Sequence, residues 1–126
     1  MQTDFKIPED NIIQWRRYIH ANPELSFKEF KTSDFVAQTL KGFDGIEVHR
    51  PTKTSVLGIL NGEQIGKTVA LRAEMDARPL QEETGVDFSS KNPGVTHACG
   101  HDAHTAMLLG TAKVLSGIKD RLAGTV

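Results

Sequence analysis

The spacing of apolar residues along the chain changes twice, from a helical period to an alternating one and back. Over residues 8–21, Ile12, Trp15 and Ile19 recur at the spacing of an amphipathic helix. We expect this helix to end before Pro23, because the residue that precedes a proline resists helical geometry. The pattern predicts a first helix with one face toward the core.

A second helical pattern extends to Lys41 and starts near a capping signal. Ser26 is followed by Glu29 at the spacing of a capping box, in which each side chain binds a free backbone N–H. Gly42 and Gly45 interrupt the pattern at its far end. We therefore expect a second helix that opens at Ser26 and ends near Lys41.

Apolar and polar residues alternate through the middle of the chain. The alternation is typical of β-strands and covers 46–49, 55–60 and 68–75. A glycine-containing stretch, 61–66, separates the last two runs. This arrangement predicts a hairpin between 55–60 and 68–75.

The last alternating run carries a charged row on one face. Successive side chains of a strand point to opposite faces, so Arg72, Glu74 and Asp76 lie on the same side. Positions two apart along a strand are separated by roughly 7 Å, which lets the two carboxylates serve one site. The alternative is an edge strand on which Arg72 and Glu74 pair with each other in solvent.

The stretch from Val95 to Thr105 concentrates side chains that bind metals. It holds three of the five histidines and the only cysteine of the chain. Cys99 and His101 are separated by Gly100, and a glycine permits a tight, left-handed turn that lets a thiolate and an imidazole converge. The stretch therefore predicts part of a metal site.

An apolar run without proline follows this stretch. Residues 102–115 are rich in alanine and leucine, and the run reaches Ser116 and Gly117, where a glycine suits a helix end. We expect a mostly buried helix of roughly four turns. The predicted ligands then lie at a helix N-terminus, where the dipole favours a thiolate or a carboxylate.

Several roles around the predicted ligands stay open. His97 is a weaker ligand candidate, and Asp102 fits a helix N-cap as well as a functional group. His104 follows His101 by about one turn, so it can face the site, line a substrate pocket or bind a carbonyl. Cys99 also fits the alternative of a small buried hydrophobe.

Composition and charge limit the range of partners. The 126 residues are 38% hydrophobic and 25% charged, with a formal net charge of −1, which argues against nucleic-acid and membrane-surface partners. One cysteine permits no internal disulfide, and neither a leader nor a membrane span is visible, so we expect a cytoplasmic protein. The two remaining histidines, His20 and His49, are interpreted as structural or exposed.

Three motifs together resemble a known enzyme family. They read H-A-N-P-E-L-S-F-K-E-F-K-T at 20–32, A-L-R-A-E-M-D-A-R-P at 70–79 and H-A-C-G-H-D-A-H-T-A-M-L-L-G at 97–110. In this order they are similar to the metal-dependent amidohydrolases that include hippurate hydrolase, N-acyl-amino-acid deacylases, N-acetyldiaminopimelate deacetylase and auxin-conjugate hydrolases. The resemblance covers nearly the whole chain.

The resemblance implies an α/β fold in which residues 1–126 are the N-terminal segment of a zinc-exopeptidase-like α/β/α catalytic domain, with the lid or dimerisation domain absent. It also implies two divalent ions, zinc, manganese or cobalt, and hydrolysis of small N-acyl amino acids. At the matching positions, Cys99 and His101 are metal ligands and Asp76 is a catalytic residue that orients the centre. The resemblance also implies that four further residues contact either the substrate or the metal ligands; they are Glu74, His97, Asp102 and His104.

The chain departs from the family pattern in two ways. Glu74 stands where aspartate is usual, and Arg78 stands where an apolar residue is usual. The paired glutamates that supply the family's general base, and its later histidine ligands, are not found in 1–126. We therefore expect this chain alone to be weakly active or inactive, and to self-associate or to need a complementing chain.

Two functions from other classes remain as alternatives. One is a cysteine hydrolase with Cys99 as the nucleophile and His97, His101 or His104 as the base. The other is a non-catalytic or degenerate module that binds a metal or a partner chain without turnover.

Overall fold

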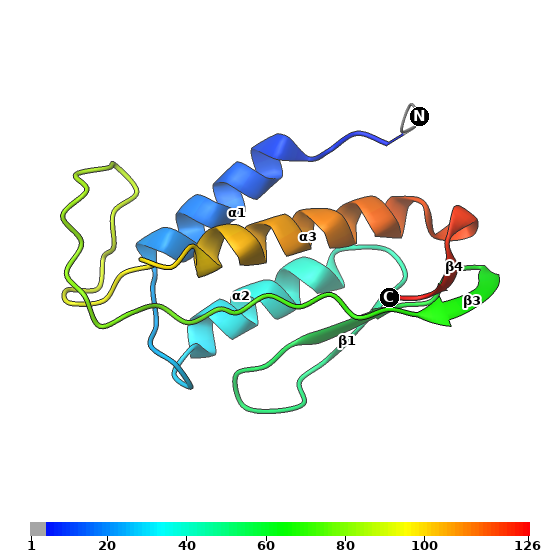
Figure 1. Ribbon diagram of the computed structural model, residues 1–126, viewed down its shortest axis with the longest axis horizontal. Coiled ribbons are helices and arrows are strands. Elements are labelled where there is room, and N and C mark those ends of the chain that lie inside the picture. The colour runs from blue at the N-terminus through cyan, green and yellow to red at the C-terminus, as the bar shows by residue number, and fades with distance from the viewer. Residues whose placement is uncertain (1–4) are drawn as a thin grey trace.

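The computed structural model describes residues 5–126 as three long helices and two short pairs of strands (Figure 1). The helices are α1 (Glu9–Ala21), α2 (Phe30–Lys41) and α3 (His101–Gly117), and a 3₁₀ turn, η1 (Lys119–Arg121), follows α3. The strands are β1 (Ile46–His49), β2 (Leu57–Leu60), β3 (Gln64–Thr68) and β4 (Ala123–Thr125). The expected α/β fold class and the predicted first and last helices are confirmed.

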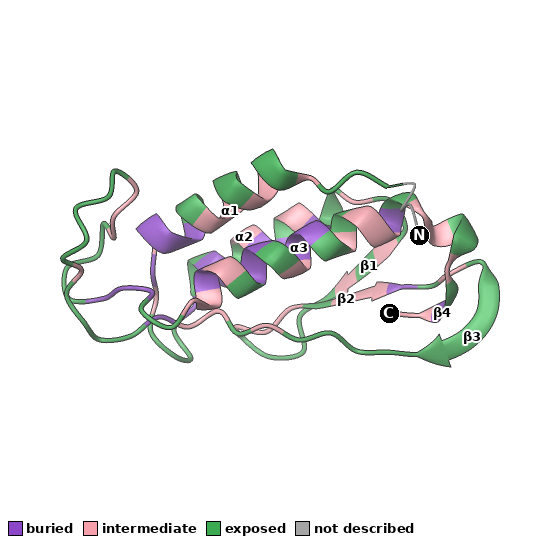
Figure 2. Cartoon of the chain, turned by 45° about the horizontal axis from the view of Figure 1, so that its top comes forward, coloured by how far each residue is buried: buried purple, intermediate pink, exposed green. Residues whose placement is uncertain are grey.

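Helix α3 packs against both α1 and α2 (Figure 1). Val36, Leu40 and Leu109 form the buried apolar cluster that joins α2 to α3. Helix α1 approaches closely at Gly110, where a Cβ atom would stand 2.5 Å from Ile12 Cδ1. Buried residues accordingly line α2, α3 and the last turn of α1 (Figure 2).

The strands pair differently from the predicted hairpin. Strand β1 pairs antiparallel with β2, with Ile46 opposite Leu60, and β3 pairs in parallel with β4. The predicted hairpin between 55–60 and 68–75 is therefore wrong. The stretch between the two runs does not form a hairpin turn, because it lies against β4. A Cβ on Gly62 would stand 2.1 Å from a carbonyl oxygen just before that strand. This close approach turns the chain away from β2.

The segment 69–76 continues β3 as an extended chain without a ladder of its own. The Val69 N–H donates to the Thr125 carbonyl at 2.9 Å, which prolongs the β3–β4 pairing by one bond. The predicted alternation of this segment is followed only in part, because Ala70 lines the same groove as its neighbours Val69 and Leu71. Its apolar side chains line a groove of about 390 Å³ together with α2, β2 and α3; they are Val69, Leu71, Ala73 and Met75.

Helix α2 begins later than its capping signal predicts. It starts at Phe30, and the carboxylate of Glu24 accepts hydrogen bonds from the N–H groups of Lys31 and Thr32 in its first turn, at 3.1 and 2.7 Å. Glu29 instead accepts the N–H of the exposed Phe27. The predicted opening at a capping box of Ser26 and Glu29 is therefore wrong, because a more distant glutamate satisfies the free donors.

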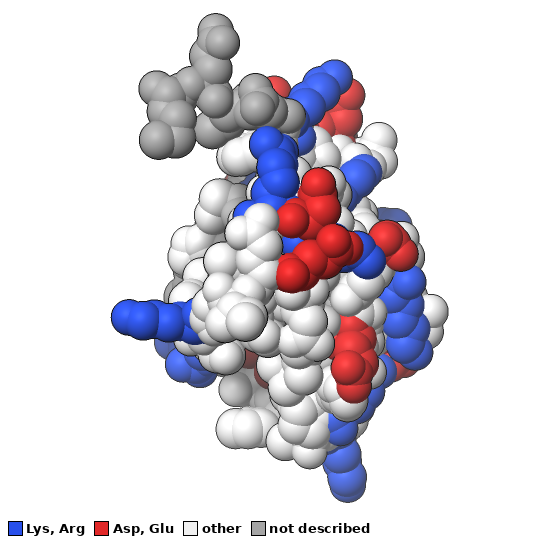
Figure 3. All heavy atoms as spheres, turned by 90° about the vertical axis from the view of Figure 1, so that its right-hand side faces the viewer, with Lys and Arg blue, Asp and Glu red and all other residues white. Residues whose placement is uncertain are grey.

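The surface carries charges of both signs. On the end of the molecule that bears β3, β4 and η1, blue and red side chains are interspersed among uncharged ones (Figure 3). Across residues 5–126, no helix combines the length and the apolar character needed to cross a membrane.

Candidate metal centre

The first two turns of α3 bind the extended segment that carries the charged row. The hydroxyl of the buried Thr105 donates to the Glu74 carbonyl oxygen at 2.9 Å, and His101 Nδ1 lies 3.0 Å from the Asp76 carbonyl oxygen. These two carbonyls are two residues apart and therefore point the same way. The segment is thus held along the helix N-terminus, with the side chains of Glu74 and Asp76 beside His101.

Three side chains converge at this place. His101 Nδ1 lies 2.9 Å from Asp76 Oδ1, and His101 Nε2 lies 3.3 Å from Glu74 Oε2. One potential ligand atom from each residue lies within 4.8 Å of the other two. Glu74 also accepts a hydrogen bond from the exposed Arg72 at 2.8 Å, so the solvent pair anticipated as an alternative exists beside the cluster.

The donor set of this cluster fits a divalent cation. When Nδ1 of His101 donates to Asp76, Nε2 is left with a lone pair that faces the Glu74 carboxylate, and two electron-rich atoms then oppose each other. A cation between them relieves that repulsion. A carboxylate that fixes the far nitrogen of a ligating histidine is also the usual arrangement behind a metal. Nitrogen and oxygen donors suit zinc, manganese and cobalt.

The same atomic positions admit a second interpretation. A doubly protonated His101 would donate one hydrogen bond to Asp76 and one to Glu74, which makes an ion-paired triad without a metal. The side chain of Glu74 is 49% exposed, and exposed acidic groups frequently pair in this way. Metal binding therefore distinguishes the two interpretations.

The turn before α3 has the predicted glycine geometry. Gly100 is the N-cap of α3 and has φ 85°, the left-handed conformation that a side chain would strain. Cys99 is exposed and is not a member of the three-residue cluster. The structure thus brings His101, Asp76 and Glu74 together and leaves the predicted ligand Cys99 at the solvent-facing edge of the turn.

An open cavity of about 620 Å³ adjoins the cluster. Glu74 and His101 contribute to its lining, and the exposed His104 lies on the same side, with its ring centroid 6.3 Å from that of His101. Met107 and Leu108 supply an apolar wall. Of the roles left open for His104, lining this cavity is the one that its position supports. The cavity combines charged and apolar surface, as small-molecule sites do.

Asp102 is buried on the far side of the same helical turn. It accepts hydrogen bonds from Arg16 Nε at 2.8 Å and from His20 Nδ1 at 2.7 Å, and its side chain is 1% exposed. Because Gly100 is the N-cap, the N-cap role considered for Asp102 is wrong. His20 was interpreted as structural or exposed, and the structure shows that it is buried. His49 is exposed and lies beside Glu47.

Sequence reasoning missed Arg16 and Glu82 as members of this buried network. Nε2 of His20 lies 3.0 and 3.1 Å from the two carboxylate oxygens of Glu82, a residue of the polar loop between the strands and α3. The place of His20 in the first motif was the only available signal. Nothing in the loop sequence distinguishes Glu82 from its acidic neighbour.

Hydrogen bonds hold the two buried carboxylates in the charged form. Burial by itself raises the pKa of Asp102, but the hydrogen bond from His20 and neighbouring positive charge outweigh it and lower the pKa. Burial likewise raises the pKa of Glu82, but hydrogen bonds from Thr84, Ser90 and His20 outweigh it and lower the pKa from 4.5 to about 2. Both groups are therefore charged at neutral pH.

His97 lies beside this network and outside the three-residue cluster. Its side chain is buried, and neither ring nitrogen has a hydrogen-bond partner within residues 5–126; Asp102 Oδ1 has none either. The His97 ring centroid is 6.4 Å from that of His20. Burial lowers the pKa of His97 below its ordinary value of 6.5, so the neutral ring is favoured.

Comparisons with known proteins identify similar sequences and a similar solved structure. Residues 70–126 match the family described as Peptidase family M20/M25/M40. An N-acyl-L-amino acid amidohydrolase of Geobacillus stearothermophilus is 59% identical over 116 residues, which are 92% of this chain and 31% of that protein. Thermostable carboxypeptidase 2 of Saccharolobus solfataricus is 53% identical over 128 residues, 100% of this chain and 32% of that protein.

A solved structure is similar as well. The YXEP protein of Bacillus subtilis, a dinuclear metal-binding peptidase from the M20 family, superimposes with a TM-score of 0.88 at 41% identity. The match covers 93% of this chain and 33% of that protein. The chain thus spans about a third of the length of the relatives it matches.

Proposed function

Because this chain belongs to Peptidase family M20/M25/M40, we propose that it supplies part of the active site of a metal-dependent amidohydrolase acting on N-acylated amino acids. The observation that carries the proposal is the convergence of Glu74, Asp76 and His101 at the N-terminus of α3, beside an open cavity. The substrate class rests on the relatives, which include an N-acyl-L-amino acid amidohydrolase and an N-acetyl-L-cysteine deacetylase.

Each residue of the centre receives a role from its contacts. His101 would hold a divalent ion through Nε2, and the carboxylate of Glu74, which faces that nitrogen, would hold the same ion. Asp76 holds the Nδ1–H of His101 and so fixes the orientation of the ring. Cys99, exposed in the turn two residues earlier, is the further ligand that the sequence predicts. A bound divalent ion would polarise the carbonyl of the scissile amide.

We further propose that the chain carries only part of a two-ion centre. The described residues 5–126 bring three potential ligand atoms within 4.8 Å of one another, and a dinuclear centre needs more donors than these and Cys99. No buried glutamate faces the cavity from within the described part of the chain to move the proton to the leaving amine. Hydrolysis of N-acyl amino acids by the isolated chain is therefore expected to be weak or absent.

Metal content and zinc affinity of the purified chain test this proposal. The variants are His101→Ala and Cys99→Ser, and the matched control is His49→Ala, which removes an exposed histidine outside the cluster. We expect bound zinc in the parent and in the control, a loss of affinity of at least tenfold in His101→Ala, and a weaker loss in Cys99→Ser. A parent chain that binds no zinc would contradict the proposal.

A chelator separates metal-dependent hydrolysis from the alternative of a cysteine hydrolase. Any hydrolysis of an N-acyl amino acid that depends on the metal centre ceases in excess chelator and returns when zinc is added. A cysteine hydrolase built on the exposed Cys99 would keep its activity in chelator. Chelator-resistant hydrolysis that is lost in Cys99→Ser would favour that alternative.

A further inference from the structure

The segment that carries Cys99 and His101 is anchored by buried carboxylates at both ends. At its start, the hydroxyl of Thr96 donates to Glu82 Oε1 at 3.1 Å. At its end, Asp102 follows His101 directly and is almost fully buried. The course of the segment between these two anchors determines where His101 points.

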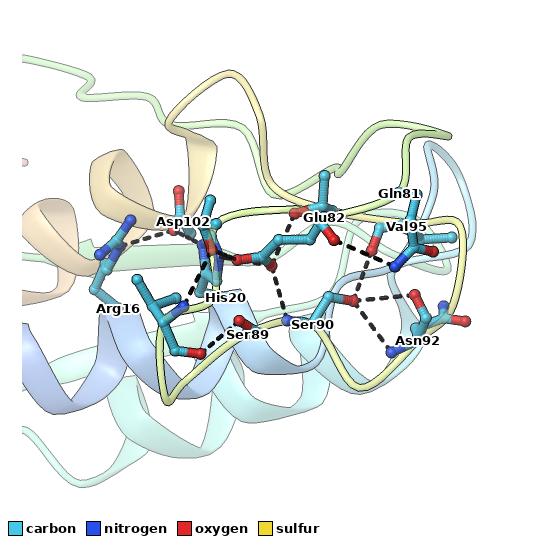
Figure 4. Close-up of polar contacts among 12 residues, drawn as sticks. Arg16, His20, Gln81, Glu82, Ser89, Ser90, Asn92, Val95 and Asp102 are labelled. Atoms are coloured by element: carbon cyan, nitrogen blue, oxygen red, sulfur yellow. Dashed lines mark hydrogen bonds and ion pairs between the residues drawn. The ribbon is translucent and has the colours of Figure 1, made fainter.

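The ring of His20 joins the two anchors. Its Nδ1 lies 2.7 Å from Asp102 Oδ2, and its Nε2 lies 3.0 and 3.1 Å from the two oxygens of Glu82 (Figure 4). The exposed fractions of the three side chains are 7% for His20, 1% for Asp102 and 4% for Glu82. An imidazole ring is rigid, so it sets the separation of the two carboxylates that it contacts.

The surroundings give this ring one orientation. Arg16 binds Asp102 from the neighbouring turn of α1, and its guanidinium lies 5.0 Å from the centroid of the Phe88 ring. Phe88 meets the His20 ring edge-on at 5.4 Å. Glu82 is fixed in turn by the Ser90 N–H at 2.8 Å. The network therefore has little freedom to adjust if the imidazole is removed.

The extended segment on the other side of the cluster is tied to the same anchors. Arg78 and Thr96 exchange two backbone hydrogen bonds, of 2.8 and 3.0 Å, and Arg78 lies two residues after Asp76. Thr96 is the residue that Glu82 holds. The position of Asp76 relative to His101 thus depends on both ends of the anchored segment.

We propose that His20 is a positioning residue for the metal centre: it spans Glu82 and Asp102 and thereby fixes His101 against Asp76 and Glu74. This inference rests on the proposed function, since it assigns His20 a part in holding the metal ligands. The alternative is a buried ionic bridge that stabilises the fold and leaves the centre unaffected. The two differ in metal affinity, because ligand sets lose affinity when their orientation relaxes.

Zinc affinity and the absorption spectrum of bound cobalt(II) test His20 directly. His20→Gly removes the ring, His20→Asn keeps an amide near the position of Nδ1, and His49→Asn is the matched control in an exposed histidine. We expect zinc affinity to fall about 10- to 100-fold in His20→Gly and less in His20→Asn, with a changed cobalt spectrum. Added imidazole, which can occupy the space of the missing ring, restores the zinc affinity and the cobalt spectrum of His20→Gly. The control matches the parent.

The outcomes separate this inference from the proposed function. A parent chain that binds neither zinc nor cobalt would contradict both the proposed function and the role of His20. A parent that binds zinc, together with a folded His20→Gly of equal affinity and identical cobalt spectrum, overturns the role of His20 alone. If circular dichroism shows that His20→Gly does not fold, His20→Asn decides by the same comparison. Unchanged zinc affinity in His20→Asn overturns the inference, and reduced zinc affinity in a folded His20→Asn supports it.

Discussion

The two ring nitrogens of His101 face different carboxylates, and the proposed role of each residue in the cluster rests on this difference. Nδ1 is bound by Asp76 through both the side chain and the backbone carbonyl, whereas Nε2 faces only Glu74. Backbone geometry maintains the arrangement, because Gly100 turns the chain in the left-handed region immediately before the helix. Orientation by Asp76 can therefore be tested separately from ligation.

Asp76→Asn is expected to weaken zinc binding by about tenfold. The amide keeps the size of the side chain but loses the charge that favours a proton on His101 Nδ1, so Nε2 becomes a poorer ligand. The matched control is Glu47→Gln, which neutralises an exposed carboxylate that pairs with His49 at 2.7 Å. Equal zinc affinity in Asp76→Asn and the parent, measured by competition with a chelating indicator, would rule out the orienting role.

Stability in acid depends on Glu82. Its pKa is about 2 in the folded chain, below the ordinary value of 4.5. Its contribution to the unfolding free energy is therefore present above pH 4.5 and is lost as the pH falls toward 2. The contribution amounts to at most about 3 kcal/mol. Urea unfolding at a series of pH values is expected to show a steeper fall of the unfolding free energy below pH 4.5 in the parent than in Glu82→Gln. Parallel curves for the two proteins would contradict this assignment.

The helices and strands differ in how much of their structure the sequence predicts. Period and capping are local properties, and the first and last helices follow the predicted ranges. The start of α2 does not, because Glu24 caps it from outside the helix. Strand pairing joins residues far apart: β3 meets β4 across about half the chain, and no alternation in the sequence specifies that partner.

The same distinction holds for the candidate site. Cys99, His101, Glu74 and Asp76 were predicted because ligand-type residues gather in short motifs. The partnership of His20 with Glu82 spans 62 residues along the chain, and a spacing of that length carries no pattern. Residues that gather in short motifs are therefore easier to predict from sequence than contacts between residues far apart along the chain.

Gly124→Ala is expected to disrupt the β3–β4 pair. Gly124 has φ 88°, and a Cβ there would stand 2.0 Å from the Lys67 carbonyl oxygen, a backbone atom that cannot move aside. Gly85→Ala is the matched control, because Gly85 has φ 72° but nothing within 4 Å of its Cβ position. We expect Gly124→Ala to lower the unfolding free energy by about 2 to 5 kcal/mol and Gly85→Ala by about 1 to 2 kcal/mol. Equal losses in urea unfolding would show that strain alone matters.

Several elements of the molecule together form one apolar groove. Its volume is about 390 Å³, and it is lined by α2, β2, α3 and the segment after β3, where Val69 is 54% and Leu71 is 50% exposed. Exposed apolar surface of this kind promotes association. The expectation of self-association made from the sequence stays a prediction, and the groove gives it a location.

The oligomeric mass of the chain is expected to rise with concentration. Val69→Lys places a charge in the groove and is expected to lower the mass at a given concentration. Ile65→Lys is the matched control, because Ile65 is fully exposed on β3 and does not line the groove. Size exclusion with light scattering provides the measurement. A parent chain that remains monomeric over a hundredfold range of concentration would exclude association through this surface.

The ring nitrogens of His101 report most directly on whether the cluster binds a metal. Long-range proton–nitrogen NMR spectra of the histidine rings, recorded during a zinc titration, distinguish protonated, free and metal-bound nitrogens. We expect zinc to shift Nε2 of His101 to the metal-bound position while Nδ1 stays protonated beside Asp76. If saturating zinc leaves both nitrogens of His101 unchanged, the Glu74–Asp76–His101 cluster is an ion-paired triad and the proposed metal centre is wrong.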